Sequence, residues 1–152
     1  MQLATEQTGS DYRTSQPSVS SVPADQVEYV WSVLRSEIES ALSKGQGDGT
    51  TVSHMLAKIL TGDMQMWAMH DEEKIHACIV VSLRKTDTMT KVFVELLAGK
   101  DMDWWGDEIE QLLHDFKDLV GATCVESSCR LGLAKYLQKR GWRKKAVIME
   151  LT

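Results

Sequence analysis

Glu95 is the residue best placed for acid–base chemistry, because it interrupts an otherwise apolar run, residues 91–98. A carboxylate surrounded by apolar residues can serve as a general base. The alternative is a glutamate that faces a cleft or a sheet edge, where it is solvated or paired with a basic residue. We therefore expect Glu95 to act as a base only if the chain is an enzyme.

The turn after this run contains Gly99, Lys100 and Gly106 and leads into an amphipathic helix. In many α/β domains such a strand-to-helix turn binds phosphate through the first free N–H groups of the helix. Asp101 and Asp103 stand in this turn as well. An aspartate at a helix start competes for those N–H groups and repels an anion. The position thus predicts a cofactor site, whereas the residues argue against one.

Trp104 and Trp105 follow each other at the start of the same helix. Adjacent residues point in different directions around a helix. We expect one indole to pack in the core. The other either fills the space of a cofactor beside the sheet or anchors a protein partner.

Five cations lie close together near the C-terminus: Lys139, Arg140, Arg143, Lys144 and Lys145. They could contact phosphate or nucleic acid, or meet the acidic segment 101–110 of a neighbouring copy. They could also be a solvated helix end that complements the helix dipole. The net charge of −5 argues against a dedicated DNA-binding protein. We expect these cations, with the two tryptophans, to form a partner-binding surface.

No set of residues has the spacing of a metal site. His70 and His76 flank a predicted hairpin turn without a third ligand, and we expect both to be exposed. Cys78, Cys124 and Cys129 form no C-x-x-C pair. Such cysteines are typical of reduced core residues in a cytosolic protein.

The length of 152 residues predicts one domain, and no apolar run is long enough to cross a membrane. Residues 1–22 are polar and are expected to form a flexible arm, followed by a single domain at 23–152. Hydrophobic periodicity predicts helices and strands in the order ααβββαβαβ. The helices are expected at 23–42, 52–60, 103–120 and 130–139, and the strands at 64–69, 75–83, 91–98, 123–127 and 143–151. This order predicts an α/β fold with a mixed, mainly antiparallel sheet and helices on both faces.

The order of elements and the segment 124–142, which ends in Gly141-Trp142, resemble the GCN5-related N-acetyltransferase (GNAT) superfamily over about residues 25–152. The resemblance implies binding of acetyl-CoA, with Gly99, Lys100 and Gly106 at the pyrophosphate turn. The family pattern R/Q-x-x-G-x-G/A is absent from that turn. The family's acid tyrosine corresponds to Leu137, and Tyr136 lies about 100° further around the helix.

A narrower resemblance is to small GNAT-like proteins of tailed bacteriophages. Met64-Gln65-Met66-Trp67, the Leu-Ala-Gly end of the central strand and the basic last helix carry it. It implies a structural protein of the virion, at the head–tail junction or inside the particle, made in the cytoplasm of the bacterial host. We expect a degenerate, non-catalytic fold without a cofactor, docked onto other virion proteins or copies of itself. The alternative is an N-acetyltransferase that binds acetyl-CoA through an atypical loop.

Overall fold

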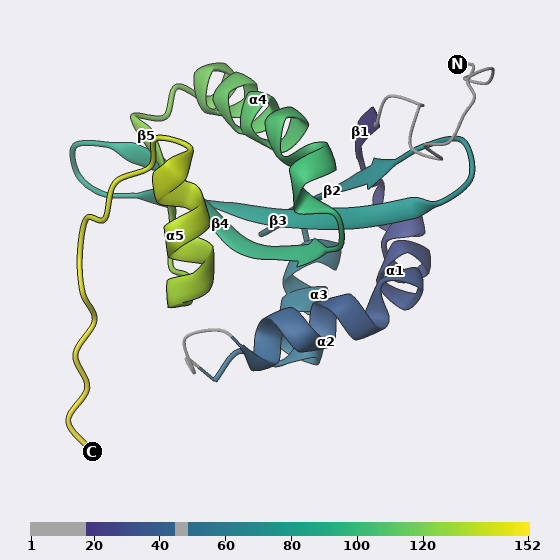
Figure 1. Ribbon diagram of the computed structural model, residues 1–152, viewed down its shortest axis with the longest axis horizontal. Coiled ribbons are helices and arrows are strands. Elements are labelled where there is room, and N and C mark those ends of the chain that lie inside the picture. The colour runs from purple at the N-terminus through teal and green to yellow at the C-terminus, as the bar shows by residue number, and fades with distance from the viewer. Residues whose placement is uncertain (1–17, 45–48) are drawn as a thin grey trace.

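A five-stranded sheet lies at the centre of this computed structural model, which describes residues 18–44 and 49–152 (Figure 1). The elements are β1 (Ser18–Ser21), α1 (Ala24–Val33), α2 (Arg35–Ser43), α3 (Val52–Leu60), β2 (Gln65–His70), β3 (Ile75–Lys85), β4 (Thr90–Gly99), α4 (Met102–Val120), β5 (Cys124–Ser127) and α5 (Leu131–Lys139). The strand order is β1-β2-β3-β4-β5, and only β4 and β5 run parallel. Helices α1–α3 cover one face and α4 covers the other, which confirms the predicted α/β class.

The helix expected at 23–42 is two helices, because the backbone at Leu34 (φ −102°, ψ 19°) departs from helical geometry. The predicted apolar face survives this break, since Val27, Val30, Trp31 and Ile38 are all buried. Helix α3 begins where expected: the hydroxyl of Thr51 accepts the backbone N–H of His54 at 3.1 Å.

Strand β3 is buried on both faces along the stretch 77–81, as its continuous apolar sequence predicts. Cys78 and Val80 pack toward α1–α3, whereas Ala77, Ile79 and Val81 pack toward α4. Burial raises the pKa of the Cys78 thiol to about 12, which keeps this thiol protonated.

Strand β4 contains a β-bulge at Glu95. Val80 of β3 lies opposite Leu96, and the next residue, Val81, lies opposite Val94, so no residue of β3 lies opposite Glu95 in the ladder. Because of this extra residue, the side chains that follow the bulge face the opposite side of the sheet from those that precede it. Before the bulge, Val94 packs toward α4; after it, Leu96 packs toward α1–α3.

Besides the divided first helix, two parts of the chain differ from the predicted order. Residues Ser18–Ser21, which belong to the predicted arm, form β1. This strand pairs with β2, with Ser18 opposite His70 and Ser21 opposite Trp67. Residues 1–17 of that arm lie outside the described residues. The strand predicted at 143–151 is not formed: residues 143–152, here called the C-terminal tail, run away from the domain (Figure 1). None of the described helices is long and apolar enough to cross a membrane.

Candidate functional site

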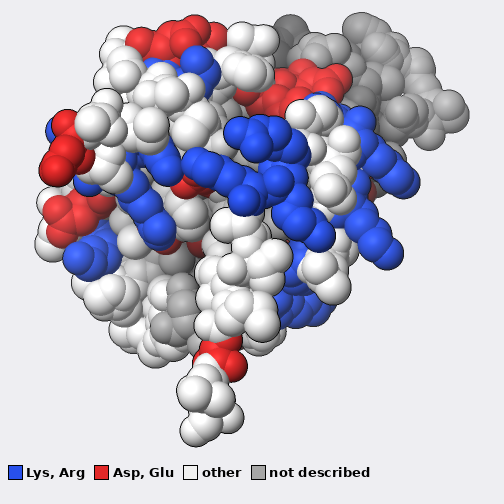
Figure 2. All heavy atoms as spheres, turned by 90° about the vertical axis from the view of Figure 1, so that its left-hand side faces the viewer, with Lys and Arg blue, Asp and Glu red and all other residues white. Residues whose placement is uncertain are grey.

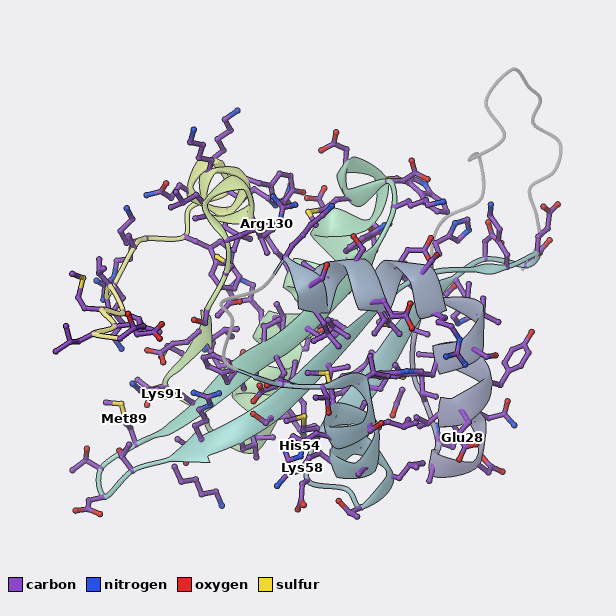
Figure 3. The ribbon with its side chains drawn as sticks, turned by 90° about the horizontal axis from the view of Figure 1, so that it is seen from below. Glu28, His54, Lys58, Met89, Lys91 and Arg130 are labelled. Atoms are coloured by element: carbon purple, nitrogen blue, oxygen red, sulfur yellow. The ribbon has the colours of Figure 1, made fainter. Side chains whose placement is uncertain are left out.

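A cleft of about 680 Å³ opens where β4 and β5 part. The two strands pair only from Lys91 opposite Cys124 to Val94 opposite Ser127, whereas β4 continues to Gly99. The walls of the cleft come from α2, the end of β4, the start of α4, and α5. Seen from below, α2 crosses the sheet, and Arg130 at the start of α5 belongs to the opposite wall (Figure 3).

Glu95 lines this cleft at the point where the strands separate. Its side chain is 16% exposed, and its Oε2 accepts hydrogen bonds from Ser82 Oγ at 2.5 Å and from Arg84 Nη2 at 3.3 Å. The guanidinium of Arg84 in turn stacks on Phe93, 3.4 Å from the ring centroid. The bulge therefore aims the carboxylate into the cleft, and two neighbours of β3 hold it there.

The turn between β4 and α4 forms the end wall of the cleft, and Gly99, Lys100 and Gly106 all line it. Asp101, in the left-handed conformation, precedes the helix, yet its side chain does not cap it. Asp103 stands in the first turn of the helix, so the turn keeps both of its acidic residues. Lys100 is exposed and pairs with Glu37 of α2 across 3.4 Å.

The tryptophan pair does not close the cleft. Trp105 is 1% exposed, and its indole N–H donates to the carbonyl oxygen of Lys100. Trp104 packs edge-on against His76 outside the cleft, with ring centroids 4.6 Å apart. Their role in partner binding stays a prediction, although Trp105 is not exposed in this structure. His76, which we expected to be exposed, is buried, and its Nε2 pairs with Asp71 at 2.8 Å.

Tyr136 of α5 also lines the cleft, contrary to what its offset from the family position indicates. Its hydroxyl is buried and makes no hydrogen bond with any described residue. Burial raises the pKa of Tyr136, and the nearby charge of Arg140 opposes this shift. The sequence pattern did place a tyrosine beside the expected position, but the direction of its side chain depends on how α5 packs against α4.

An ion-pair network, here called the α4–α5 latch, holds the wall that carries Tyr136. Arg140 donates from Nε and Nη2 to the two carboxylate oxygens of Glu110, at 2.9 and 3.0 Å, and also pairs with Asp107. The indole N–H of Trp142 donates to Glu110 at 3.2 Å. The hydrogen bond from Arg140 is the main cause that lowers the pKa of Glu110.

The residues of the predicted basic surface fall into two groups, those that form ion pairs within the domain and those that are exposed. Arg140 belongs to the latch, and Lys145 pairs with Glu126 of β5. Lys139, Arg143 and Lys144 are exposed where α5 ends and the tail begins, and Figure 2 shows Lys and Arg side chains gathered on this face. Binding of a partner by these cations stays a prediction. Within residues 18–44 and 49–152, no group of His, Cys, Asp and Glu side chains could hold a metal ion.

The sequence matches no protein-family model and no curated protein, whereas the structure has many similar solved structures. One is a GCN5-related N-acetyltransferase from Ralstonia eutropha, with TM-score 0.65, 10% identity, and coverage of 90% of this chain and 98% of that one. Another is glucosamine-6-phosphate N-acetyltransferase from Arabidopsis thaliana, with TM-score 0.64, 13% identity, and coverage of 91% and 99%. A predicted acetyltransferase from Clostridium acetobutylicum, solved with acetyl-CoA, has TM-score 0.65, 10% identity, and coverage of 90% and 96%.

The chain has the GNAT fold. This GNAT-like domain nevertheless lacks the family's glycine pattern at the turn after β4, where Gly99 and Gly106 are separated by six residues. The cleft lies beside that turn and is open, so the missing pattern has not been replaced by side chains that fill the space.

The interpretation of this GNAT-like domain as a phage virion component is wrong. The similar structures named above are acetyltransferases, and they favour the alternative, an enzyme, over a structural protein of a particle. Three sequence features favour a degenerate fold: the acidic turn after β4, the offset of Tyr136 from the family position, and the polar arm at residues 1–22. In the folded chain the turn borders an open cleft, and the tyrosine lines it.

Proposed function

We propose that the chain is an N-acetyltransferase that moves an acetyl group from acetyl-CoA to an amine. The observation that carries this proposal is one cleft with a carboxylate on one wall and, on another, a buried hydroxyl that forms no hydrogen bond with the described residues. Glu95 supplies the first group and Tyr136 the second. A transfer from a thioester to an amine needs a base for the ammonium proton and a donor for the departing sulfur.

Several features of the cleft fit acetyl-CoA. Its volume of about 680 Å³ lies within the usual range of ligand pockets. The first turn of α4 borders it, and free N–H groups at a helix N-terminus are suited to phosphate. Gly106 and Lys100 would lie beside that phosphate. A bound thioester supplies an activated acetyl group, and the acetyltransferase found with acetyl-CoA shares this fold.

Glu95 accepts the proton of the acceptor amine in this proposal. Its hydrogen bonds from Ser82 and Arg84 fix the carboxylate and hold it in the cleft. Tyr136 donates a hydrogen bond, and then its proton, to the sulfur that leaves. Its raised pKa suits a donor, because the hydroxyl stays protonated at neutral pH.

Incubation of the purified chain with acetyl-CoA and a panel of primary amines tests the proposed activity. We expect free thiol to be released and the mass of at least one of the amines to increase by about 42 Da, the mass that an acetyl group adds. Glu95→Gln is the matched control and should release no thiol above the background. Equal thiol release by this variant would contradict the proposal, as would a failure to acetylate any amine.

A further inference from the structure

Glu37 of α2 is a second carboxylate in the cleft, and it takes no part in the proposed transfer. It stands in the first turn of its helix, and its side chain is 17% exposed. Burial alone would raise the pKa of Glu37, but hydrogen bonds from its own backbone N–H, from Ser36 and from Lys100 lower it overall. The side chain is therefore negatively charged at neutral pH.

The cation that pairs with Glu37 is weakly held. Lys100 Nζ lies 3.4 Å from Glu37 Oε2, and the side chain of Lys100 is 77% exposed. An ion pair with so exposed a partner contributes little to stability, so another ion can replace the lysine at little cost. Lys100 also stands in the turn before α4, where the pyrophosphate of acetyl-CoA is proposed to lie. A bound pyrophosphate would compete with Glu37 for this ammonium group.

Glu37 and Glu95 lie on the same side of the sheet. Cys78 and Val80 of β3 pack toward α1–α3, and alternation along the strand places Ser82 on the same face. Ser82 donates to Glu95. The charge of Glu37 adds to the effect of burial in raising the pKa of the Cys78 thiol, which places Glu37 near Cys78. Both carboxylates therefore belong to the side on which α2 crosses the strands (Figure 3).

The separation of the two carboxylates suits a short diamine. Cys78 lies opposite Ala98 of β4, which is three residues beyond Glu95, and such a stretch of strand spans about 10 Å. A carboxylate holds an ammonium group at about 3 Å. One ammonium at each carboxylate leaves several ångströms between them, which an aliphatic chain of about four to six carbons spans. Leu96 and Ala41, which also line the cleft, provide apolar surface for that chain.

Lys44 and Arg84 line the cleft as well, but neither pairs with Glu37. Arg84 and Ser82 both donate to Oε2 of Glu95, which leaves Oε1 without a hydrogen bond from the described residues. Lys44 stands at the end of α2, about two helical turns from Glu37. Each carboxylate thus has an oxygen that a ligand ammonium can reach once Lys100 leaves Glu37.

We propose that Glu37 is a second cation site of the cleft and that the acceptor is an aliphatic diamine. Acetyl-CoA draws Lys100 to its pyrophosphate, and the far ammonium of the diamine replaces Lys100 at Glu37 while the reacting amine lies at Glu95. Donor and acceptor bind cooperatively, because each favours the position of Lys100 that the other needs. This inference rests on the proposed function and deepens it by naming the class of acceptor.

Kinetics with two matched acceptors test the second cation site. We expect kcat/KM for 1,5-diaminopentane to exceed that for 1-aminopentane by about tenfold or more, because only the diamine has an ammonium group for Glu37. In Glu37→Gln this ratio should fall to about one, whereas Glu39→Gln, an exposed change on the same helix, should preserve it. Equal values for the two amines in the unmodified chain, or an undiminished ratio in Glu37→Gln, would overturn the proposal.

Calorimetric titration with 1,5-diaminopentane tests the exchange of Lys100 without acetyl transfer. CoA replaces acetyl-CoA here, because it has the same pyrophosphate and no acetyl group to transfer. We expect CoA to tighten diamine binding to the unmodified chain about fivefold or more. Lys100→Met should bind the diamine without CoA as tightly as the unmodified chain does with it, and Lys44→Met should tighten binding far less.

Two outcomes of this titration would overturn the exchange: no effect of CoA on diamine binding, or a Lys100→Met variant that binds the diamine no more tightly than the unmodified chain alone. The titration also separates this inference from the proposed function. A chain that shows the expected binding but acetylates neither amine would contradict the proposed activity and support the cation site at Glu37.

Discussion

The hydroxyl of Tyr136 lies against Gly106, so that a Cβ added to Gly106 would be 2.6 Å from the Tyr136 oxygen. Gly106 is buried in the first turns of α4, and Tyr136 reaches it from α5. The absence of a side chain at this glycine is therefore what admits the tyrosine hydroxyl to the cleft. This contact links the α4 wall to the group that we propose as proton donor.

Gly106→Ala is expected to lower acetyl transfer while leaving the fold nearly unchanged. Alanine favours a helix over glycine by about 1 kcal/mol, which offsets part of the cost of the close contact. Tyr136 must move to make room, so we expect kcat to fall about tenfold or more. Gly132→Ala in α5 is the control, because its Cβ would meet only the flexible end of Arg130. Equal loss of activity in both variants would contradict the explanation.

Tyr136→Phe separates activity from stability. The hydroxyl is buried and has no hydrogen-bond partner in the described part of the chain, so its removal is expected to leave the melting temperature unchanged or to raise it slightly. If the hydroxyl donates the proton, kcat falls by about 10²-fold. Tyr29→Phe, which alters an exposed tyrosine, should change neither quantity. A fully active Tyr136→Phe would exclude the tyrosine as donor.

Glu95→Gln keeps the size of the side chain and removes its ability to take a proton. We expect kcat/KM to fall by about 10²-fold or more, with the affinity for acetyl-CoA unchanged. Steady-state kinetics and a separate binding titration measure the two quantities. Glu28→Gln, on the far helix α1 (Figure 3), is the control and should match the unmodified chain. An active Glu95→Gln would leave the carboxylate with a structural role only.

Because of the α4–α5 latch, we expect the free energy of unfolding to decrease at acid pH. The pKa of Glu110 is lower in the folded chain than its ordinary value of about 4.3. Its stabilisation is therefore fully present above that value and is lost as the pH falls through the folded pKa. We expect Glu110→Gln to cost about 1–2 kcal/mol at pH 7, a moderate figure because the ion pair is partly exposed.

Denaturant unfolding of the unmodified chain and of the Glu110→Gln variant measures this pH dependence. The measurements run from about pH 3 to about pH 7, a range that includes the ordinary pKa of glutamate. The difference in unfolding free energy between the two chains should be constant near neutral pH and should shrink in acid. A constant difference throughout would show that Glu110 keeps its ordinary pKa when folded, and a difference that grows in acid would show that its folded pKa is raised; either result would contradict the prediction.

Thiol reactivity checks the burial of β3. Cys78 is 0% exposed, and its thiol pKa is raised to about 12, whereas Cys124 and Cys129 are half-buried. A thiol reagent at pH 8, about the usual pH for such reactions, should therefore leave Cys78 unmodified in the folded chain. Mass spectrometry of digested protein locates the label. Rapid labelling of Cys78 would show that β3 opens far more readily than its packing indicates.

Local sequence signals predicted those parts of the fold that local interactions determine. Cap chemistry allows Thr50 or Thr51 to begin the helix at 52–60, and the structure uses Thr51. Glycine geometry accounts for the end of α4 at Gly121, whose φ is +70°, and apolar periodicity accounts for the doubly buried β3. The break at Leu34 did not follow, because the apolar spacing is the same on both sides of it. A helical pattern shows which face is buried and says nothing of a change in axis.

The candidate site was less predictable than the elements around it. Val92, Val94, Leu96 and Ala98 alternate without interruption, which hides the bulge because both faces of β4 are covered. Tyr136 could not be placed, since its direction depends on the long-range contact of α5 with α4. The prediction of Glu95 as candidate base required only one polar residue in an apolar strand, and its role stays a prediction.

Calorimetric titration of the folded chain with acetyl-CoA tests the central claim, that the cleft beside β4 is a donor site. We expect saturable binding of one molecule per chain with a Kd in the micromolar range. Free pantetheine, which lacks the phosphates proposed to lie at the start of α4, should bind much more weakly. Absence of saturable heat at millimolar acetyl-CoA, with a chain shown to be folded, would contradict the claim.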